Sequence, residues 1–133
     1  MPVETVHIQW KGEHALESRL PSGKVITIDS AGPKPLEMVI ASLGGCAGLT
    51  ALAFAQKMRL NLTRLEIEVS GDLADGKVPA IKGGRLKYRL WGPDLQKEQV
   101  ERLVELCEKY CPVYQTLKHA GPIEHSYEIN PAS

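Results

Sequence analysis

The sequence predicts an α+β fold in which a largely antiparallel sheet accompanies one long apolar helix. Residues 5–10 and 65–91 alternate apolar and polar side chains with a period of two, which is typical of half-buried strands. Between these regions, residues 38–56 contain no charged side chain and indicate a helix buried on most sides. A second helical pattern and a final alternating segment complete the predicted order β-β-(β)-α-β-β-α-β.

The N-terminal third predicts a meander of two or three strands. Residues 5–10, 15–20 and 24–29 are short segments with alternating or β-favouring side chains. Gly12 and the tripeptide Pro21–Gly23 separate them, and both supply residues that favour turns. We therefore expect these strands to pair in an antiparallel manner.

One long helix is predicted from Leu36 to Met58. Pro35 suits its first position, where a missing backbone N–H costs little. The uncharged stretch 38–56 has 19 residues and could just span a bilayer, but its polar side chains and glycines keep its hydrophobicity modest. A buried core helix is the favoured interpretation, and no membrane association is expected.

The three glycines of this helix, Gly44, Gly45 and Gly48, require an explanation, because each costs about 1 kcal/mol relative to alanine. Close approach of another backbone is one explanation, and a local kink is another. A chain of this size can hardly cover an apolar helix on all sides from within. A second copy of the chain could cover it, so we expect a homodimer.

The second half of the chain predicts a β-hairpin, a second helix and a last strand. In the hairpin, residues 65–70 and 85–91 flank a polar loop at 72–84. The second helix is expected to begin with Asp94 as its N-cap. Periodicity predicts that the inward faces consist of Leu86, Tyr88 and Leu90 in the hairpin, of Val100, Leu103, Val104, Cys107 and Cys111 in the helix, and of Ile123, His125, Tyr127 and Ile129 in the strand.

Length and composition are those of an ordinary globular domain. The 133 residues predict one domain over positions 1–133, and 43% hydrophobic with 24% charged residues is typical of a folded chain. Sixteen basic residues balance sixteen acidic ones, so no long-range field favours nucleic acid. The N-terminus lacks a basic and apolar leader, so a cytoplasmic location is expected. In that compartment, the three cysteines are expected to be reduced thiols.

The cysteines are the main chemical signal. Any single cysteine can be a small buried hydrophobic residue, but two positions are unusual. Cys46 is surrounded by glycines, which expose its side chain, and Cys111 directly precedes Pro112, where the helix ends or bends. Cys107 lies one turn earlier, inside the apolar stripe. A zinc site built from these cysteines and a histidine matches no common ligand spacing, so no metal is expected.

Two segments carry a family resemblance. Residues 35–46 read PLEMVIASLGGC, and residues 109–117 read KYCPVYQTL. Together they resemble the OsmC/organic hydroperoxide resistance (Ohr) family of thiol peroxidases, in its OsmC-like branch, and the similarity extends over the whole chain in element order and length. The resemblance implies an OsmC-like fold, in which an intertwined homodimer packs its central cysteine-bearing helices between two sheets.

The resemblance also implies a chemistry. The Cys46 thiolate would attack the O–O bond of an organic hydroperoxide and become a sulfenic acid. Cys111 would condense with that sulfenic acid to form a disulfide. A dithiol reductant, of lipoyl type in the better-known branch, would restore both thiols. No metal or organic cofactor is implied.

In the family, an N-terminal arginine stabilises the thiolate and is held by a glutamate near the start of the cysteine helix. Arg19 is the only arginine before residue 59, and Glu37 is the candidate acid, one residue further from Pro35 than the glutamate of the better-known branch, which corresponds to Leu36. A solvated charge at a strand end is the competing interpretation of Arg19. At about 100° per residue, Glu37 and Cys46 fall on opposite faces of an unbroken helix. Either the pair Gly44–Gly45 distorts the helix, or Glu37 serves as a helix N-terminal charge, which we favour.

Two questions stay open from the sequence. Cys107 and Cys111 share a helix face, so periodicity does not select the residue that resolves Cys46. The place of Cys107 in the apolar stripe, the adjacent Pro112 and the family context favour Cys111, with Cys107 as a spectator. A glycine-lined groove at Cys46 could instead bind a small hydrophobic ligand, or the thiols could sense oxidants without efficient turnover.

Overall fold

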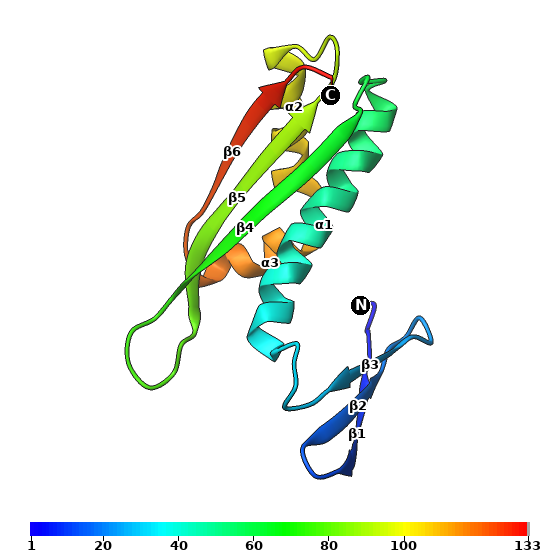
Figure 1. Ribbon diagram of the computed structural model, residues 1–133, viewed down its shortest axis with the longest axis vertical. Coiled ribbons are helices and arrows are strands. Elements are labelled where there is room, and N and C mark those ends of the chain that lie inside the picture. The colour runs from blue at the N-terminus through cyan, green and yellow to red at the C-terminus, as the bar shows by residue number, and fades with distance from the viewer. Residues whose placement is uncertain (133) are drawn as a thin grey trace. The chain divides into compact units, whose positions relative to one another are not determined.

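The computed structural model describes residues 1–132 and contains, within them, two three-stranded sheets and three α-helices. The chain forms two compact units, Met1–Val39 and the segment from Ile40 onward. Figure 1 shows the elements in chain order, coloured from blue to red. The architecture confirms the predicted α+β class and the predicted order of strands and long helices.

The first unit is an antiparallel meander of β1 (His7–Gly12), β2 (Ala15–Arg19) and β3 (Val25–Ile28). The turn between β1 and β2 contains Gly12 and Glu13, which both adopt positive φ values. Each of the three segments with a strand pattern therefore forms a strand, including the two with the weaker alternation.

The apolar residues of this meander are largely exposed. Ile8 and Trp10 on β1 are 59% and 69% exposed, and Val25 on β3 is 47% exposed. Ser18 is the one buried residue within positions 1–39. The meander therefore has apolar side chains but no core within its own unit.

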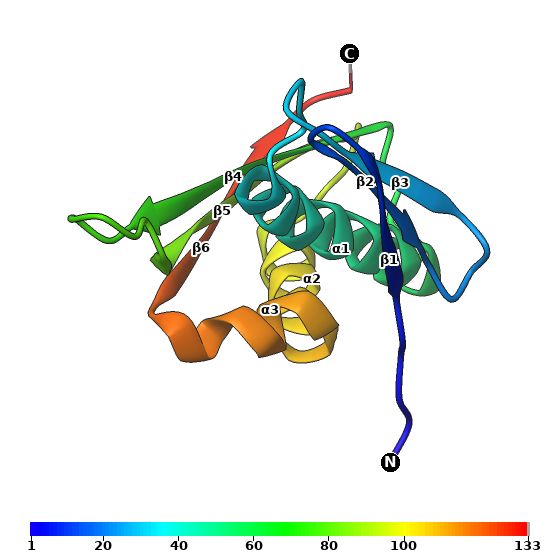
Figure 2. The same ribbon diagram turned by 90° about the horizontal axis from the view of Figure 1, so that it is seen from below.

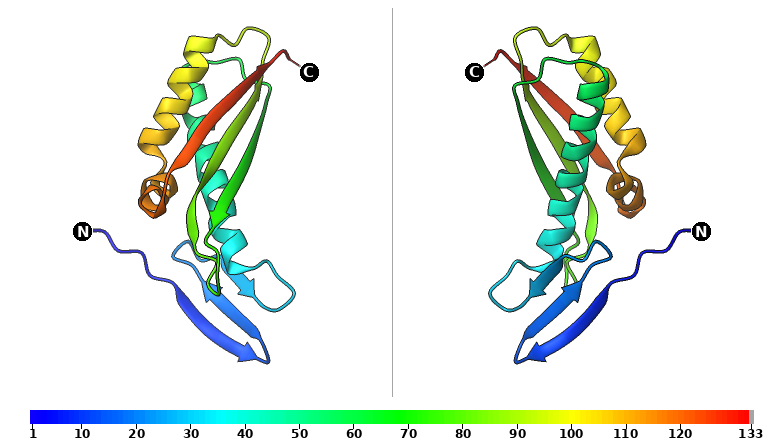
Figure 3. Two further views of the ribbon diagram at one scale, coloured as in Figure 1. Left: turned by 90° about the vertical axis from the view of Figure 1, so that its left-hand side faces the viewer. Right: turned by 90° about the vertical axis from the view of Figure 1, so that its right-hand side faces the viewer.

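The second unit packs two helices on one face of a sheet. The sheet has the order β4-β5-β6, and α1 and α2 lie on the same side of it (Figure 2, Figure 3). α3 follows α2 directly and leads through a short 3-10 turn into β6. The elements are α1 (Pro35–Lys57), β4 (Arg64–Leu73), β5 (Ile81–Trp91), α2 (Lys97–Tyr110), α3 (Pro112–Leu117), the 3-10 turn (Lys118–Ala120) and β6 (Ile123–Asn130).

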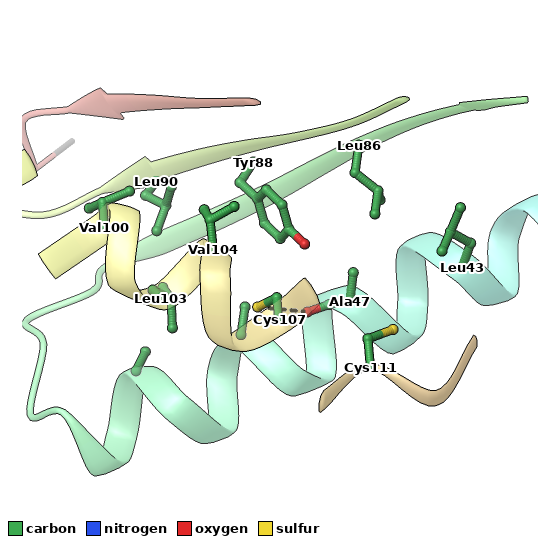
Figure 4. Packing of buried hydrophobic residues seen from close by; sticks show 12 residues of the cluster. Leu43, Ala47, Leu86, Tyr88, Leu90, Val100, Leu103, Val104, Cys107 and Cys111 are labelled. Carbon is green, nitrogen blue, oxygen red and sulfur yellow. Dashed lines mark hydrogen bonds between the residues drawn. The ribbon is translucent and has the colours of Figure 1, made fainter. Parts of the chain in front are cut away.

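The core lies between this sheet and the two helices (Figure 4). Leu86, Tyr88 and Leu90 of β5 are at most 1% exposed, as their period-two pattern predicts. The apolar stripe of α2 meets them, and α1 contributes mostly small side chains that permit close packing. The buried residues of the two helices are Leu43, Gly44, Ala47, Ala51, Ala55, Val100, Leu103, Val104 and Cys107.

β6 adds a parallel pairing to sheets that are otherwise antiparallel. It runs alongside β5, with Gly84 opposite Ile123 and Trp91 opposite Asn130. A parallel neighbour requires a crossover connection, and α2 with α3 provides it. The alternation of residues 123–129 predicts the strand and its inward face but carries no information about its direction.

The polar loop of the hairpin is shorter than predicted. β5 begins at Ile81, so the predicted loop boundary at Gly84 is wrong. Gly84 lies within β5, directly against the Ser70 carbonyl of β4. A Cβ atom would collide with that carbonyl, which explains why the residue is a glycine. This glycine permits close strand pairing rather than a turn.

The start of α2 also differs from the prediction. Its N-cap is Gln96 rather than Asp94, and the Gln99 side chain accepts a hydrogen bond from the Gln96 N–H at 3.3 Å. Asp94 lies in the preceding turn, where its backbone carbonyl accepts a hydrogen bond from Gln96 Nε2 at 3.3 Å. The capping role therefore falls to a glutamine pair two residues further along the chain.

α1 is helical throughout its glycines, and close packing explains one of them. At Gly44, an added Cβ atom would lie 2.8 Å from Val69 Cγ1 of β4, whereas at Gly45 it would meet no atom within 4 Å. Within the described residues, α1 alone is long and apolar enough to cross a membrane, a test that the core helix of a soluble protein also passes. Its other faces are open, since Leu49 is 72% exposed.

Candidate active site

Three free cysteines gather where α1 passes the end of α2. Cys46 lies on α1 and is partly exposed, whereas Cys107 and Cys111 are buried at 1% and 0% exposure. Cys107 belongs to the last turn of α2, and Cys111 lies between α2 and α3. One thiol therefore faces solvent in this chain and two belong to its core.

The structure brings Cys46 and Cys111 together, although they are far apart in the sequence. The two side chains are neighbours, and Cys46 adds to burial in raising the pKa of Cys111. Thr50 Oγ1 donates a hydrogen bond to the Cys46 carbonyl at 2.8 Å within α1. Neighbouring thiols on separate elements are the arrangement from which a disulfide can form.

Cys111 occupies the break between two helices. Its N–H donates to the Cys107 carbonyl at 3.0 Å and ends α2, and Pro112 then begins α3. The Tyr114 N–H donates to Cys111 Sγ at 3.5 Å. Burial raises the pKa of the Cys111 thiol, and the Tyr114 N–H opposes that rise because it stabilises a thiolate.

Cys107 has the opposite hydrogen-bonding pattern. Its Sγ acts as a donor to the Ala47 carbonyl of α1 at 3.8 Å (Figure 4). Burial is the main cause that raises the pKa of Cys107 to about 11; a hydrogen bond with Tyr88 opposes the rise, and the nearby Cys111 and Glu108 add to it. Burial therefore favours the protonated thiol at both cysteines, and each has one donor that favours a thiolate, Tyr88 at Cys107 and Tyr114 at Cys111.

The two charged candidates have local partners. Arg19, in the first unit, has a 65% exposed side chain whose Nη2 lies 3.7 Å from Glu17 Oε1. The Glu37 carboxylate accepts a hydrogen bond from the Lys34 N–H at 3.3 Å, at the start of α1. This contact supports the interpretation of Glu37 as a helix N-terminal charge. The role of Arg19 at Cys46 stays a prediction.

A second group of polar residues lies near Cys107, on the side of β5 and β6. His125 of β6 has a 4% exposed side chain, and its Nδ1 lies 3.3 Å from Glu108 Oε1 of α2. Its ring stacks on Tyr88 at 6.2 Å and meets Tyr114 edge-on at 4.7 Å. The sequence places His125 on the inward face of its strand, but the pattern assigns it no role. Within residues 1–132, three or more histidine, cysteine or acidic side chains nowhere form a metal-binding group.

A sheet, two covering helices and three free cysteines between them define a thiol-bearing α+β protein. The family model described as OsmC-like protein matches residues 28–126. The chain belongs to the OsmC-like family, which confirms the resemblance found in its two cysteine segments. This match includes parts of both compact units, and one domain over residues 1–133 stays a prediction.

Relatives and solved structures agree with this assignment. The protein YhfA of Escherichia coli K12 is 32% identical over 113 residues, which is 81% of this chain and 84% of YhfA. A hypothetical protein from Aquifex aeolicus VF5 is 25% identical, with full coverage of both chains and a TM-score of 0.87. The organic hydroperoxide resistance protein OhrB of Bacillus subtilis is 18% identical over 95% of this chain and 98% of its own, with a TM-score of 0.63. The last comparison shows a shared fold.

Proposed function

We propose that this protein is a thiol peroxidase that reduces organic hydroperoxides through Cys46 and Cys111. The observation that carries the proposal is the proximity of a partly exposed and a buried thiol, on a fold shared with a protein named for organic hydroperoxide resistance. A peroxidase of this kind needs one thiol that the oxidant can reach and a second thiol beside it.

The reaction balances with these two thiols and an external dithiol. Cys46 reduces the hydroperoxide to an alcohol and becomes a sulfenic acid, which keeps the transferred oxygen. Cys111 then attacks the sulfenic sulfur, so that a disulfide forms and water leaves. A dithiol reductant of lipoyl type then exchanges with this disulfide, becomes a disulfide itself and releases both thiols. Arg19 is the candidate for stabilising the Cys46 thiolate, and Glu37 is the candidate for holding Arg19, with a role as helix N-terminal charge as the favoured alternative.

Turnover measured with a lipoyl dithiol tests this proposal. An alkyl hydroperoxide should be consumed faster than hydrogen peroxide, because an apolar tail adds binding energy. Cys46→Ser should abolish consumption with the fold unchanged, and Cys107→Ser is the matched control that should retain it. Consumption that persists in Cys46→Ser would contradict the proposal.

The proposed working form is a homodimer. The exposed apolar residues of α1 and of the N-terminal meander support it, since Leu49, Leu52 and Trp10 are 72%, 49% and 69% exposed. Light scattering at micromolar concentration should give about twice the 14.6 kDa mass of one chain. A mass of one chain would contradict the dimer.

A second candidate function is the binding of a small hydrophobic ligand. An apolar groove of about 520 Å³ lies between α1 and β4 and is lined by Gly44, Gly45, Gly48 and neighbouring aliphatic residues. Cys46 is not among the residues that line it, so a ligand there would be separate from the thiol chemistry. Binding of an apolar dye that Cys46→Ser leaves intact, without any peroxide turnover, would favour this candidate.

A further inference from the structure

Cys111 lies in a corner between two helices, which comprises residues 108–115. α2 ends at Tyr110 and α3 begins at Pro112, so Cys111 is the single residue between them. Its N–H donates to the Cys107 carbonyl at 3.0 Å, and its own carbonyl accepts a hydrogen bond from the Gln115 N–H at 3.0 Å. The position of the Cys111 thiol therefore depends on how the two helices are held at this corner.

The corner lies against α1, next to Cys46 (Figure 4). Cys107 Sγ lies 3.8 Å from the carbonyl oxygen of Ala47, the residue that follows Cys46. The side chains of Cys46 and Cys111 are neighbours. On its far side, the corner continues into α3, which has six residues and no buried one, so partly buried side chains alone pack this helix against the core.

His125 of β6 contacts both helices of the corner. Its Nδ1 lies 3.3 Å from Glu108 Oε1, on α2 three residues before Cys111. Its ring meets the Tyr114 ring edge-on at 4.7 Å, on α3 three residues after Cys111. The ring also stacks on Tyr88 of β5 at 6.2 Å, which fixes it to the sheet. One side chain of the sheet therefore joins the helix before Cys111 to the helix after it.

The two residues that His125 contacts are also joined to the rest of the corner. Gln115 Nε2 donates to the Glu108 carbonyl at 2.7 Å, which connects α3 to α2 across Cys111. The Tyr114 N–H donates to Cys111 Sγ at 3.5 Å. A displacement of Glu108 or Tyr114 would therefore be transmitted to the backbone or the sulfur of Cys111.

The histidine is an expensive residue at this position. Its side chain is 4% exposed, and within the described residues its Nε2 is buried without a hydrogen-bond partner. A phenylalanine would fill the same space without that cost in folding free energy. What the imidazole adds to packing is Nδ1, which faces the Glu108 carboxylate.

We propose that His125 is a positioning residue that holds the corner through Glu108 and Tyr114 and so keeps the Cys111 thiol beside Cys46. For turnover, the inference rests on the proposed peroxidase function. In that reaction the Cys111 sulfur attacks the sulfenic sulfur of Cys46, the S–S bond forms, the S–O bond breaks, and the oxygen leaves as water with the Cys111 proton. A fixed corner raises the effective concentration of one thiol at the other.

The first experiment needs no hydroperoxide. In a Cys107→Ala background, Cys46 and Cys111 are the two remaining thiols of the full chain. The protein is equilibrated with mixtures of reduced and oxidised dithiothreitol, whose disulfide takes up two electrons and two protons as the 46–111 bond forms. The ratio at half oxidation gives the equilibrium constant and hence the reduction potential of the pair.

His125→Phe keeps a ring against Tyr114 and removes the nitrogen that faces Glu108. It should lower the equilibrium constant for the 46–111 disulfide by about threefold or more, which is about 14 mV or more toward less negative potential at about 30 mV per factor of ten. An unchanged potential would overturn the proposal.

Tyr127→Phe is the matched control. Tyr127 lies two residues from His125 on the same face of β6, and its hydroxyl donates to Glu101 Oε1 of α2 at 2.8 Å. It therefore also joins β6 to α2, but ten residues before Cys111. Loss of this hydroxyl should leave the potential unchanged. An equal shift in Tyr127→Phe and His125→Phe would overturn the proposal, because packing of α2 on the sheet in general would then explain both.

Glu108→Ala removes the same contact from the other side, at a side chain that is 44% exposed, so that the fold is not at risk. It should shift the potential in the same direction as His125→Phe. The double variant should shift it no further than the larger single change, because both changes remove one interaction. Additive shifts would overturn the proposal, since each residue would then act by itself.

The second experiment follows one turnover in the full chain. After one equivalent of an alkyl hydroperoxide, dimedone traps the Cys46 sulfenic acid, and non-reducing peptide mapping measures the 46–111 disulfide. His125→Phe should form the sulfenic acid at the wild-type rate and convert it to the disulfide about threefold or more slowly. Equal slowing of both steps would overturn the positioning role.

The two experiments separate the possible failures. If wild type forms no sulfenic acid and no disulfide with the hydroperoxide, the proposed peroxidase function fails. The dithiothreitol equilibrium still decides, independently, whether His125 positions Cys111. A potential that is unchanged in both His125→Phe and Glu108→Ala would overturn the inference while leaving the peroxidase function in place.

Discussion

The two sheets of this protein have similar sequence patterns and different surroundings. In the β1–β3 meander, the alternating residues Ile8 and Trp10 are 59% and 69% exposed. In the second sheet, the alternating residues Leu86 and Leu90 are fully buried beneath two helices. A period of two therefore reports which face of a strand is apolar, but it does not report what covers that face.

The difference also separates what one chain stabilises by itself from what it leaves for a partner. The second sheet has its covering helices in the same unit, so its core is complete within one chain. The meander buries Ser18 and no other residue of positions 1–39. The proposed homodimer would cover exposed apolar area of this kind.

The largest expected effect is the loss of a core side chain in the second sheet. Leu86→Ala should lower the free energy of unfolding by about 2–5 kcal/mol, because it leaves a cavity in a closely packed core. Val25→Ala in the meander is the matched change. For a single chain it should change the free energy of unfolding by no more than about 0.5 kcal/mol. Urea unfolding measures both, and equal losses would show that the meander has a core of comparable packing.

The two adjacent glycines of α1 sharpen the comparison on one helix. Gly44→Ala should destabilise by about 1–2 kcal/mol, because contact with Val69 outweighs a helix-propensity gain of about 1 kcal/mol. At Gly45 an added methyl group meets open space, so Gly45→Ala should raise the free energy of unfolding of a single chain by up to about 1 kcal/mol. Thermal unfolding measures both changes. A loss at Gly45 would reveal a partner packed against that face.

The second sheet also buries an ionisable side chain, which makes its stability depend on pH. Burial lowers the pKa of His125 below its ordinary value of 6.5. At a pH between the folded pKa and about 6.5, the unfolded chain binds a proton on this residue that the folded chain does not. The stability that is present above about pH 6.5 is therefore lost as the pH falls toward the folded pKa. The slope is at most about 1.4 kcal/mol per pH unit. His125→Phe should reduce this pH dependence of the free energy of unfolding, measured by urea unfolding at several pH values. An unchanged slope would show that another residue causes the pH dependence.

The smallest effect on folding is expected at Trp10, which is 69% exposed on the meander. Trp10→Ser should change the unfolding free energy of a single chain by no more than about 0.5 kcal/mol. Its effect should instead appear in association, as a lower average mass in light scattering at a given concentration. An unchanged mass would place the partner surface on other residues.

Much of the second unit could be predicted because its residues carry unambiguous periodicity. Leu86, Tyr88 and Leu90 lie inward as their alternation predicts, and the α2 stripe through Cys107 is buried as its helical spacing predicts. The direction of β6 could not be predicted, because a strand pattern is the same in either direction. It depends on the crossover through α2 and α3, which is a tertiary feature.

The site was accessible from sequence only in part. The family resemblance predicts that Cys46 and Cys111 are neighbours, whereas the His125–Glu108 pair joins β6 to α2 and has no local signature. Gly84 shows the converse problem, since glycine favours both turns and close strand pairing, and only the neighbouring Ser70 carbonyl decides between them.

The contact between Cys46 and Cys111 has a consequence for heat resistance. A covalent bond there would close a loop of about 65 residues and remove about 4 kcal/mol of chain entropy from the unfolded state, in the loop-closure treatment. The oxidised protein would then melt at a higher temperature than the reduced one. The melting temperature of a sample would then report what fraction of the protein carries the disulfide.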